Sequence, residues 1–426
     1  MSTPGPTSHT RTNTPSRTES RGRVDVFDGL RGVAIVLVVL SHGWALWPSD
    51  YTLGHRPLST LFASGNFAVS IFFAVGAFVA TRGLLRKAHS PAGLHPLVEV
   101  VRRYVRLTGQ VAFLLLAIVL VSLFDDADPS TDQDTRVSLV RIVTYSWNWY
   151  LQSNALVARS DLGHLWYLSV YFQVLALITV LVWLLRRRPM WLLVVLATLL
   201  VGFEVWTAHV YPQEGYYQAL LRTSVRIDAP LTGALAAAAL PYLSRFRQYA
   251  AAAGTLAVVS LVPLAYFTTP FAGYFRWAGH LTDVALFVFV ASAVLAPLPG
   301  VVAATLSWRP LAFLGRRSLG LYIWHYPIFL FLSRHTFNWA WGWRAAAAFG
   351  LVLACTLVSE WLVENRILRA LSSPAWRELD YGIPAYVVRR WRAWRGKPGP
   401  VSAVDEAGGS SPTTSAPPRR RPRADA

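Results

Sequence analysis

The chain has 426 residues, of which 54% are hydrophobic and only 15% are charged, and its mean hydropathy is +0.38. A soluble domain carries about 25% charged residues, so this composition excludes an ordinary soluble enzyme and predicts a membrane protein. The net charge is +18, but the basic residues lie in short clusters between apolar runs, which argues against a nucleic-acid-binding surface. The single cysteine, Cys355, excludes an internal disulfide and a thiolate metal cluster, and we expect no metal site.

About ten apolar runs are long enough to cross a ~30 Å hydrocarbon core. Every second connection between them is basic, as at Arg186–Arg188, whereas the connection 125–163 begins with several aspartates. The apolar runs predict an all-α membrane bundle, and the positive-inside rule places both termini in the cytoplasm. Two lysines against 38 arginines suggest a bacterial genome, and hence a bacterial plasma membrane. The expected spans lie near residues 30–47, 67–84, 106–124, 164–185, 189–207, 228–243, 249–267, 279–297, 318–335 and 346–368.

Two tails flank the predicted membrane domain, which covers residues 25–370. Residues 1–24 and 397–426 are rich in Ser, Thr, Pro and Arg, and this composition predicts disorder on the cytoplasmic side. Segment 371–396 contains "AYVVRRWRAWRG", which is typical of an amphipathic helix on an anionic membrane surface. An arginine-rich tail without that role is the alternative. The apolar face would consist of Val387, Val388, Trp391 and Trp394.

The first span carries charged and titratable residues that crossing a membrane does not require. Arg31 and His42 are eleven positions apart, so they share one helix face and lie about 16 Å apart along its axis. Asp28 is predicted to cap the helix N-terminus, and Gly29 and Gly32 to allow another helix or a ligand to approach closely. Titratable groups at bilayer depth indicate function. A membrane anchor for Arg31 and a packing role for His42 are the alternatives.

The stretch "FDGLRGVAIVLVVLSH" resembles the opening signature of the acyltransferase-3 family: a basic residue, ten intervening residues and a histidine. The likeness extends over about residues 25–366, because "RRYVRL", "GHLWYLSV", "VRIDAPLTGALAA" and "RRSLGLYIWHYPIF" are similar to further motifs of that family. Two places depart from it. Tyr171, Phe172 and Gln173 stand where many members have Glu-Glu-Gln, and "VENRI", with Glu364, replaces Glu-x-Pro.

This resemblance implies a stand-alone acyltransferase without the esterase-like domain that is fused to some members. Its reaction would move an acyl group, acetyl or another short chain, to a hydroxyl of a carbohydrate, glycolipid or natural product. The donor would be acyl-CoA, a co-substrate rather than a tightly bound cofactor. His42 would be the general base, with a covalent acyl-histidine as the alternative, and Arg31 would hold the anionic end of the donor.

Further site residues follow from the same motifs. Arg103 and Arg106 lie on one helix face and would bind the donor's phosphates, unless they are only a positive-inside cluster. His325 is interpreted as a packing residue. The possible acceptor-site residues are His164, Trp166, Arg226 and Asp228. The alternative for His164 and Trp166 is anchoring at the membrane interface. The alternative for Arg226 and Asp228 is an ion pair or a helix cap.

Two other classes of protein compete with this interpretation. A transporter or flippase without chemistry of its own also needs polar residues inside helices. A transporter of this kind is expected to contain an internal repeat, with broken helices at corresponding positions of its two halves. The predicted spans show no such repeat. A polyprenyl-phosphate-dependent glycosyltransferase would use acidic residues at the outer face, such as those between Asp125 and Asp134.

Overall fold

The structure is a computed structural model that describes residues 17–47, 56–269 and 273–394. Within these ranges all regular structure is helical, and no strand occurs. Most of the predicted tails 1–24 and 397–426 lies outside the described residues. The first helix begins at Arg17, seven residues before the predicted end of the N-terminal tail.

Long helices alternate with short connecting helices. The first half of the chain forms α1 (Arg17–Leu46), α3 (Arg56–Ala63), α4 (Gly65–Ala88), α5 (Pro96–Ser122), α6 (Asp132–Val143), α7 (Trp147–Asn154), η1 (Ser160–Leu165), α8 (Trp166–Leu185) and α9 (Pro189–Leu221). The second half forms α10 (Thr223–Arg226), α11 (Asp228–Leu243), η2 (Ser244–Phe246), α12 (Arg247–Phe267), η3 (Tyr274–Ala278), α14 (Gly279–Leu295), α15 (Gly300–Leu306), α16 (Arg309–Arg316), α17 (Ser318–His335), α18 (Trp341–Ser359), η4 (Glu360–Glu364), α19 (Asn365–Leu371), α20 (Pro374–Leu379) and α21 (Ile383–Trp394).

Eight helical segments in the described part of the chain are long and apolar enough to cross a membrane. One of them, Thr223–Phe267, contains both α11 and α12, which are separated by the short turn η2. Helix α17 is not among the eight, because histidine, tyrosine, proline and arginine residues make it more polar. The all-α membrane class is therefore confirmed, and the count of ten spans stays a prediction.

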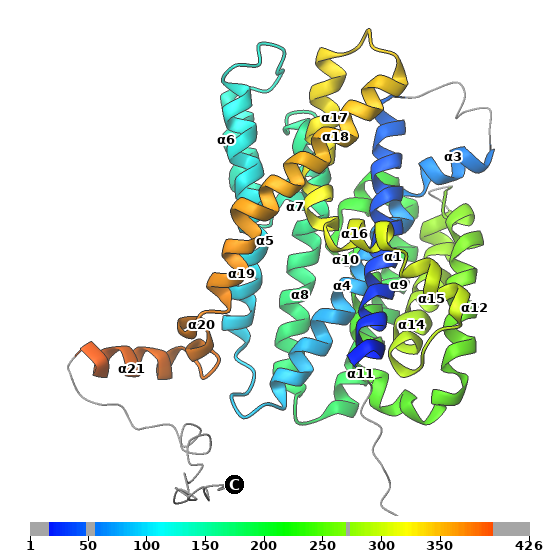
Figure 1. The fold of residues 1–426 in the computed structure, drawn as a ribbon, viewed down its shortest axis with the longest axis vertical. Coiled ribbons are helices and arrows are strands. Elements are labelled where there is room, and N and C mark those ends of the chain that lie inside the picture. The colour runs from blue at the N-terminus through cyan, green and yellow to red at the C-terminus, as the bar shows by residue number, and fades with distance from the viewer. Residues whose placement is uncertain (1–16, 48–55, 270–272, 395–426) are drawn as a thin grey trace, which may run out of the picture.

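The helices form a bundle whose two ends differ in charge (Figure 1). We call the end at which α1 begins the α1-start end. The basic connections after α4 and α8 and the turn η2 lie there, whereas the acidic α5–α6 connection lies at the opposite end. There a capping box between Thr131 and Asp134 starts α6. The charge alternation read from the sequence thus corresponds to two separate ends of the bundle.

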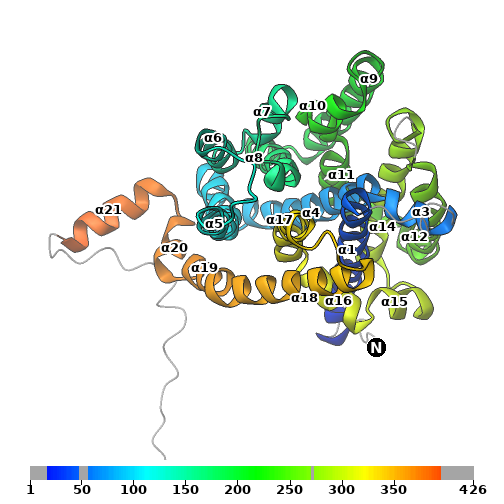
Figure 2. The same ribbon diagram turned by 90° about the horizontal axis from the view of Figure 1, so that it is seen from above.

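Helix α17 occupies the interior of the bundle, next to α1, α5 and α18 (Figure 2). Helix α1 packs against α4, α16 and α17. Its glycines make this possible: a Cβ on Gly29 would lie 1.5 Å from the Leu306 carbonyl oxygen, and one on Gly32 would lie 2.1 Å from that of Leu311. The predicted close approach at these glycines is confirmed, and the approaching group is the backbone of α15 and α16.

Helix α21 lies away from the bundle, across the direction of the long helices (Figures 1 and 2). Val387, Trp391 and Trp394 are exposed, and Trp394 is 82% accessible. The side chain of Val388 lies outside the described residues. Exposed apolar side chains on a helix away from the bundle are compatible with a membrane-surface segment, which stays a prediction.

Candidate active site

His42 of α1 and His325 of α17 form the centre of the candidate site. The His42 Nδ1 atom lies 2.8 Å from His325 Nε2, and the two rings stack with centroids 5.0 Å apart. His325 is fully buried, whereas His42 is partly exposed. The interpretation of His325 as a packing residue is therefore incomplete, because it is the direct partner of the proposed base.

The hydrogen bonds assign the protons of this pair. His325 Nδ1 lies 2.7 Å from the Tyr322 carbonyl oxygen, and a carbonyl can only accept, so Nδ1 carries the proton. In a neutral His325, Nε2 is then an acceptor, and His42 Nδ1 must donate to it. A doubly protonated His325 would bury an unpaired cation. His42 therefore keeps its Nε2 lone pair free to accept a proton.

His164 of η1 joins the same cluster. Its ring centroid lies 5.3 Å from that of His325, and its Nε2 donates to the Ile323 carbonyl at 3.2 Å. The Tyr322 hydroxyl donates to the backbone carbonyl of His164. His164 is 3% exposed, and its Nδ1 has no hydrogen-bond partner among the described residues. The structure thus brings His164 next to His325 in the same cluster, and its acceptor-site role stays a prediction.

Tyr326 is a neighbour that the sequence analysis did not single out. Its ring centroid lies 4.9 Å from that of His42 and 5.2 Å from that of His164. The only signal in the sequence is its position next to His325. Trp166, by contrast, packs at 6.5 Å from Phe73 and has no ring contact with the histidines in the described chain.

Arg31 links α1 to the first turn of α17. Its Nη2 donates to the Ser318 hydroxyl at 2.9 Å, and its Nη1 lies 3.8 Å from the Asp28 carboxylate. The same carboxylate lies 3.9 Å from Arg316. Asp28 is not a helix cap, because α1 begins at Arg17 and Asp28 lies inside the helix. Its physical role is to pair with two arginines at the junction of α1 and α16.

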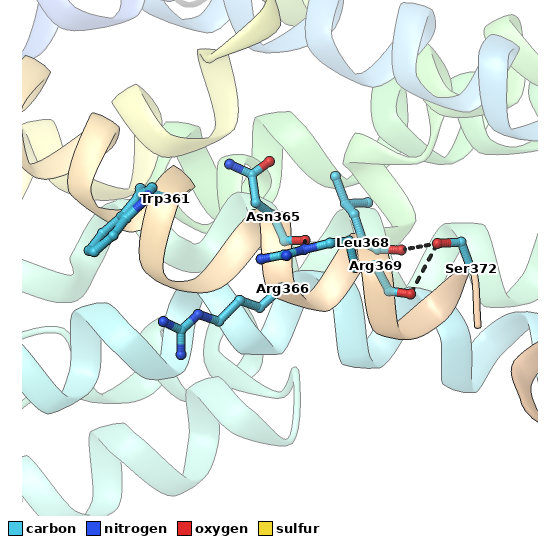
Figure 3. A pocket seen from close by; sticks show the side chains of 6 residues that line it. All are labelled: Trp361, Asn365, Arg366, Leu368, Arg369 and Ser372. Atoms are coloured by element: carbon cyan, nitrogen blue, oxygen red, sulfur yellow. Dashed lines mark hydrogen bonds between the residues drawn. The ribbon is translucent and has the colours of Figure 1, made fainter.

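Arg103 and Arg106 start on one face of α5 but reach different places. Arg103 donates to the Thr179 hydroxyl of α8 at 2.9 Å. The Arg106 side chain is 55% exposed and lies 4.0 Å from the Glu364 carboxylate. Figure 3 shows a pocket on η4 and α19, two helices that pack against α5. It is lined by Trp361, Asn365, Arg366, Leu368, Arg369 and Ser372.

Arg226 and Asp228 belong to a separate group. Arg226 is fully buried and donates to the Tyr274 hydroxyl at 2.5 Å and to Ser70 at 3.3 Å. Asp228 accepts the backbone amide of Ala229 at 2.8 Å. Among the described residues no ion pair joins Arg226 to Asp228, so the predicted ion pair is wrong: the tyrosine and serine hydroxyls solvate the guanidinium instead. Such burial leaves no room for a sugar at Arg226.

Gln173 follows Tyr171 and Phe172, the two residues that stand in place of the family's acidic pair. Its amide donates to the Tyr145 carbonyl at 2.6 Å and to Asn148 at 3.0 Å, and its oxygen accepts from Thr223 at 2.5 Å. These bonds tie α8 to α7 and α10. Gln173 therefore has a structural role, with every polar atom of its amide engaged.

The comparisons with known proteins match most of the chain to one family. The acyltransferase-3 family model, described as an acyltransferase domain, matches residues 24–361. The chain is 26% identical over 335 residues to the peptidoglycan O-acetyltransferase OatA of Listeria monocytogenes, covering 72% of this chain and 50% of that protein. It is 24% identical over 323 residues to the O-acetyltransferase OatA of Staphylococcus aureus, covering 72% of this chain and 51% of that protein. The chain thus spans about half the length of these relatives.

No solved structure matches the chain. The family match covers most of the chain, and it includes the His42, His164 and His325 cluster as well as the two arginines of α5. The chain therefore belongs to the acyltransferase-3 family.

Proposed function

We propose that this chain is a membrane O-acyltransferase that moves an acetyl or other short acyl group from acyl-CoA to a hydroxyl of a cell-envelope glycan. The observation that carries the proposal is the hydrogen-bond chain from the Tyr322 carbonyl through His325 to His42, which leaves His42 Nε2 as a free proton acceptor. The names of the two relatives support an O-acetyl product, and that of the Listeria protein supports peptidoglycan as the acceptor.

The reaction follows from that lone pair. His42 Nε2 removes the proton of the acceptor hydroxyl while its oxygen attacks the thioester carbonyl carbon, which forms the new C–O bond. The tetrahedral intermediate collapses, the C–S bond breaks, and the protonated His42 returns its proton to the leaving CoA sulfur. His325 keeps the imidazole in the required tautomer and stabilises the imidazolium through the same hydrogen bond.

Donor binding is proposed at the α1-start end. Arg103 and Arg106 begin on one face of α5, and the pocket of Figure 3 adds Arg366 and Arg369 on the neighbouring helix. Guanidinium groups suit phosphates because they form two parallel hydrogen bonds to one group. Arg31 lies about 16 Å from His42 along α1, too far to touch it. Its proposed role is to hold the anionic end of the donor.

The acceptor side is proposed at the other face of His42. His164 Nδ1 is a buried hydrogen-bond acceptor without a partner among the described residues, and Tyr326 packs against both rings. A second sugar hydroxyl can donate to His164 Nδ1 while the reacting hydroxyl donates to His42. This arrangement would align the acceptor.

Label transfer tests the proposed function. Purified full-length protein in membranes would be incubated with radiolabelled acetyl-CoA and peptidoglycan fragments or other glycans. We expect label in an alkali-labile ester on the glycan. Release of unmodified glycan or lipid across the membrane without label transfer would contradict the proposal and favour a transporter.

We also propose ten spans with both termini in the cytoplasm. The support is that α14 packs against both α11 and α12, so the chain turns back at η2 and the segment Thr223–Phe267 crosses twice. Helix α17, although more polar, lies inside the bundle and is shielded from lipid by α1, α5 and α18.

Two glutamines provide a matched topology test. Gln133 at the start of α6 and Gln248 at the start of α12 are both exposed and lie at opposite ends of the bundle. Each would be replaced by cysteine in a Cys355→Ser background. An impermeant thiol reagent added to intact cells should label Gln133→Cys only. Labelling of Gln248→Cys would contradict the proposed orientation.

A further inference from the structure

Three carboxylates from three different helices meet in the half of the bundle away from α17. Glu204 of α9, Asp228 of α11 and Asp283 of α14 each offer an oxygen, and these oxygens all lie within 4.8 Å of one another. Asp228 is 5% exposed and Asp283 is 4% exposed. Three like charges at this separation repel strongly in a buried site, so something must compensate them.

Asp283 shows that the described side chains do not provide this compensation. Neither of its carboxylate oxygens has a hydrogen-bond partner among the described residues, although the side chain is almost fully buried and points toward the other two carboxylates. The hydroxyl of Thr207, one turn beyond Glu204 on α9, is 2% exposed and also lacks a partner in the described chain. A buried polar group without a partner costs several kcal/mol, so its persistence points to a ligand.

No basic side chain in the described chain forms a direct ion pair with Asp283. The Arg226 guanidinium donates to Tyr274 and Ser70, and in the described residues it forms no ion pair with any of the three carboxylates. His280 Nδ1 lies 2.5 Å from Glu204, which orients that carboxylate but leaves the two aspartates without a basic partner within salt-bridge distance. The cluster therefore has an excess of negative charge in a segment that spans the membrane.

We propose that Glu204, Asp228 and Asp283 bind a divalent cation, with Ca²⁺ as the best fit. Carboxylate oxygens are hard ligands, which favours Ca²⁺, Mg²⁺ or Mn²⁺ over soft metals. The three oxygens lie within 4.8 Å of one another, which is close enough for one cation to reach all of them. Ca²⁺ accepts irregular sets of carboxylate ligands, whereas Mg²⁺ demands near-ideal octahedral geometry and keeps several waters.

Such an ion would be structural rather than catalytic. It would hold α9, α11 and α14 together, beside the Arg226 group that joins α10 to α4 and η3. In the described chain no hydrogen bond or ion pair connects these residues to His42, and the proposed acyl transfer does not use them. His280 would act as the outer partner that fixes the Glu204 ligand, a common feature of metal sites.

The first experiment measures calcium on the intact wild-type protein. Protein purified in detergent would be stripped with EGTA and titrated with radioactive Ca²⁺ from ~10 µM to ~10 mM, the range over which weaker protein calcium sites bind. We expect one ion per chain and a Ca²⁺-dependent rise in the midpoint of thermal unfolding. Mg²⁺ should act more weakly, and Na⁺ at matched ionic strength should not act. Absence of saturable binding would overturn the proposal and favour a proton shared by the carboxylates.

The second experiment locates the ion with matched variants. Asp283→Asn keeps the shape and removes the charge, and we expect Ca²⁺ binding to weaken by more than ~10-fold, at least the effect of losing an outer partner. Asp126→Asn changes an exposed aspartate outside the cluster and should bind as the wild type does. If Asp283→Asn fails to fold, Glu204→Gln provides the same comparison. Unchanged binding in the folded cluster variant would place the ion elsewhere and refute this site.

Discussion

Two clusters of buried polar side chains lie in this bundle, and they differ in how their polar groups find partners. In the histidine cluster, the Tyr322 carbonyl, His325 and His42 satisfy one another, and one lone pair remains beside a partly exposed ring. In the carboxylate cluster, Asp283 has no partner among the described residues and three acidic groups converge. Neutral imidazoles can pair directly, whereas like charges cannot. The first cluster is therefore ready to move a proton, and the second is ready to hold a cation.

The largest expected effect is the loss of the base. His42→Ala should lower acyl transfer by roughly 10²–10⁴-fold, the usual contribution of a positioned acid or base, with normal membrane expression. Activity of the wild type should also fall as the pH drops through the histidine's titration, because only neutral His42 accepts a proton. His89→Ala, at an exposed histidine, is the control. Near-normal acyl transfer by His42→Ala in a direct assay would show that His42 is not the base. The histidine cluster would then have no role in proton transfer that distinguishes it from the carboxylate cluster.

A smaller effect is expected from the partner of the base. His325→Leu removes the acceptor for His42 Nδ1–H, and a lost buried hydrogen bond of about 1–3 kcal/mol corresponds to roughly 5- to 150-fold in kcat. The KM for the donor should not change, because the donor arginines are untouched. His325→Gln offers an oxygen acceptor and should recover part of kcat. Equal loss with leucine and glutamine would mean that His325 only fills space.

The donor arginines should give a weaker effect that is confined to KM. Arg103→Lys keeps the charge but loses the planar group that donates to Thr179, and we expect the donor KM to rise by about 2- to 10-fold, the value of one hydrogen bond. Thr179→Val should reproduce this rise, because it removes the same contact. Arg86→Lys, at an exposed arginine of the same end, is the control. Unchanged donor kinetics in the first two variants would make Arg103 a topology signal only.

The smallest effect concerns a third cluster, in which one arginine pairs with two aspartates and in which Asp128 and Arg159 lie outside the eight candidate spans. Arg159 bonds to Asp128 at 2.7 Å and to Asp161 at 2.8 Å. Burial alone would raise the pKa of Asp128, but the Ser130 amide and Arg159 outweigh it and hold that pKa below its usual value. The resulting stability is present above the unfolded pKa of about 3.9 and is lost as the pH falls through the lower folded value.

Thermal unfolding between pH 5 and pH 3 checks this third cluster. We expect the wild type to lose more stability over this window than Asp128→Asn, whose side chain does not titrate. Asp132→Asn, at an exposed aspartate that has no such partner set, should follow the wild type. Ca²⁺ should not alter the difference, since Arg159 already pairs directly with both carboxylates. A Ca²⁺-dependent change in this difference would contradict the proposal that only the Asp283 cluster binds the ion.

The membrane class and the Arg31–His42 face were predictable from the chain alone because both are local properties. Apolar run length defines a span, and the helical repeat places residues eleven positions apart on one face. The family motifs added His164 and the arginines of α5. The N-cap at Asp28 was mispredicted because α1 continues back to Arg17, and Gly29 and Gly32 revealed a close approach without naming its partner.

The pairing within each cluster required the packed bundle. His42 and His325 are separated by 283 positions, and Glu204, Asp228 and Asp283 come from three helices. Which helices are neighbours, and how each is rotated, depends on the packing of side chains from the whole chain rather than on the period of any one helix. A nearby charge in the sequence is therefore a poor guide to partners: Arg226 lies two positions from Asp228, yet its guanidinium donates to Tyr274 and Ser70 from other parts of the fold.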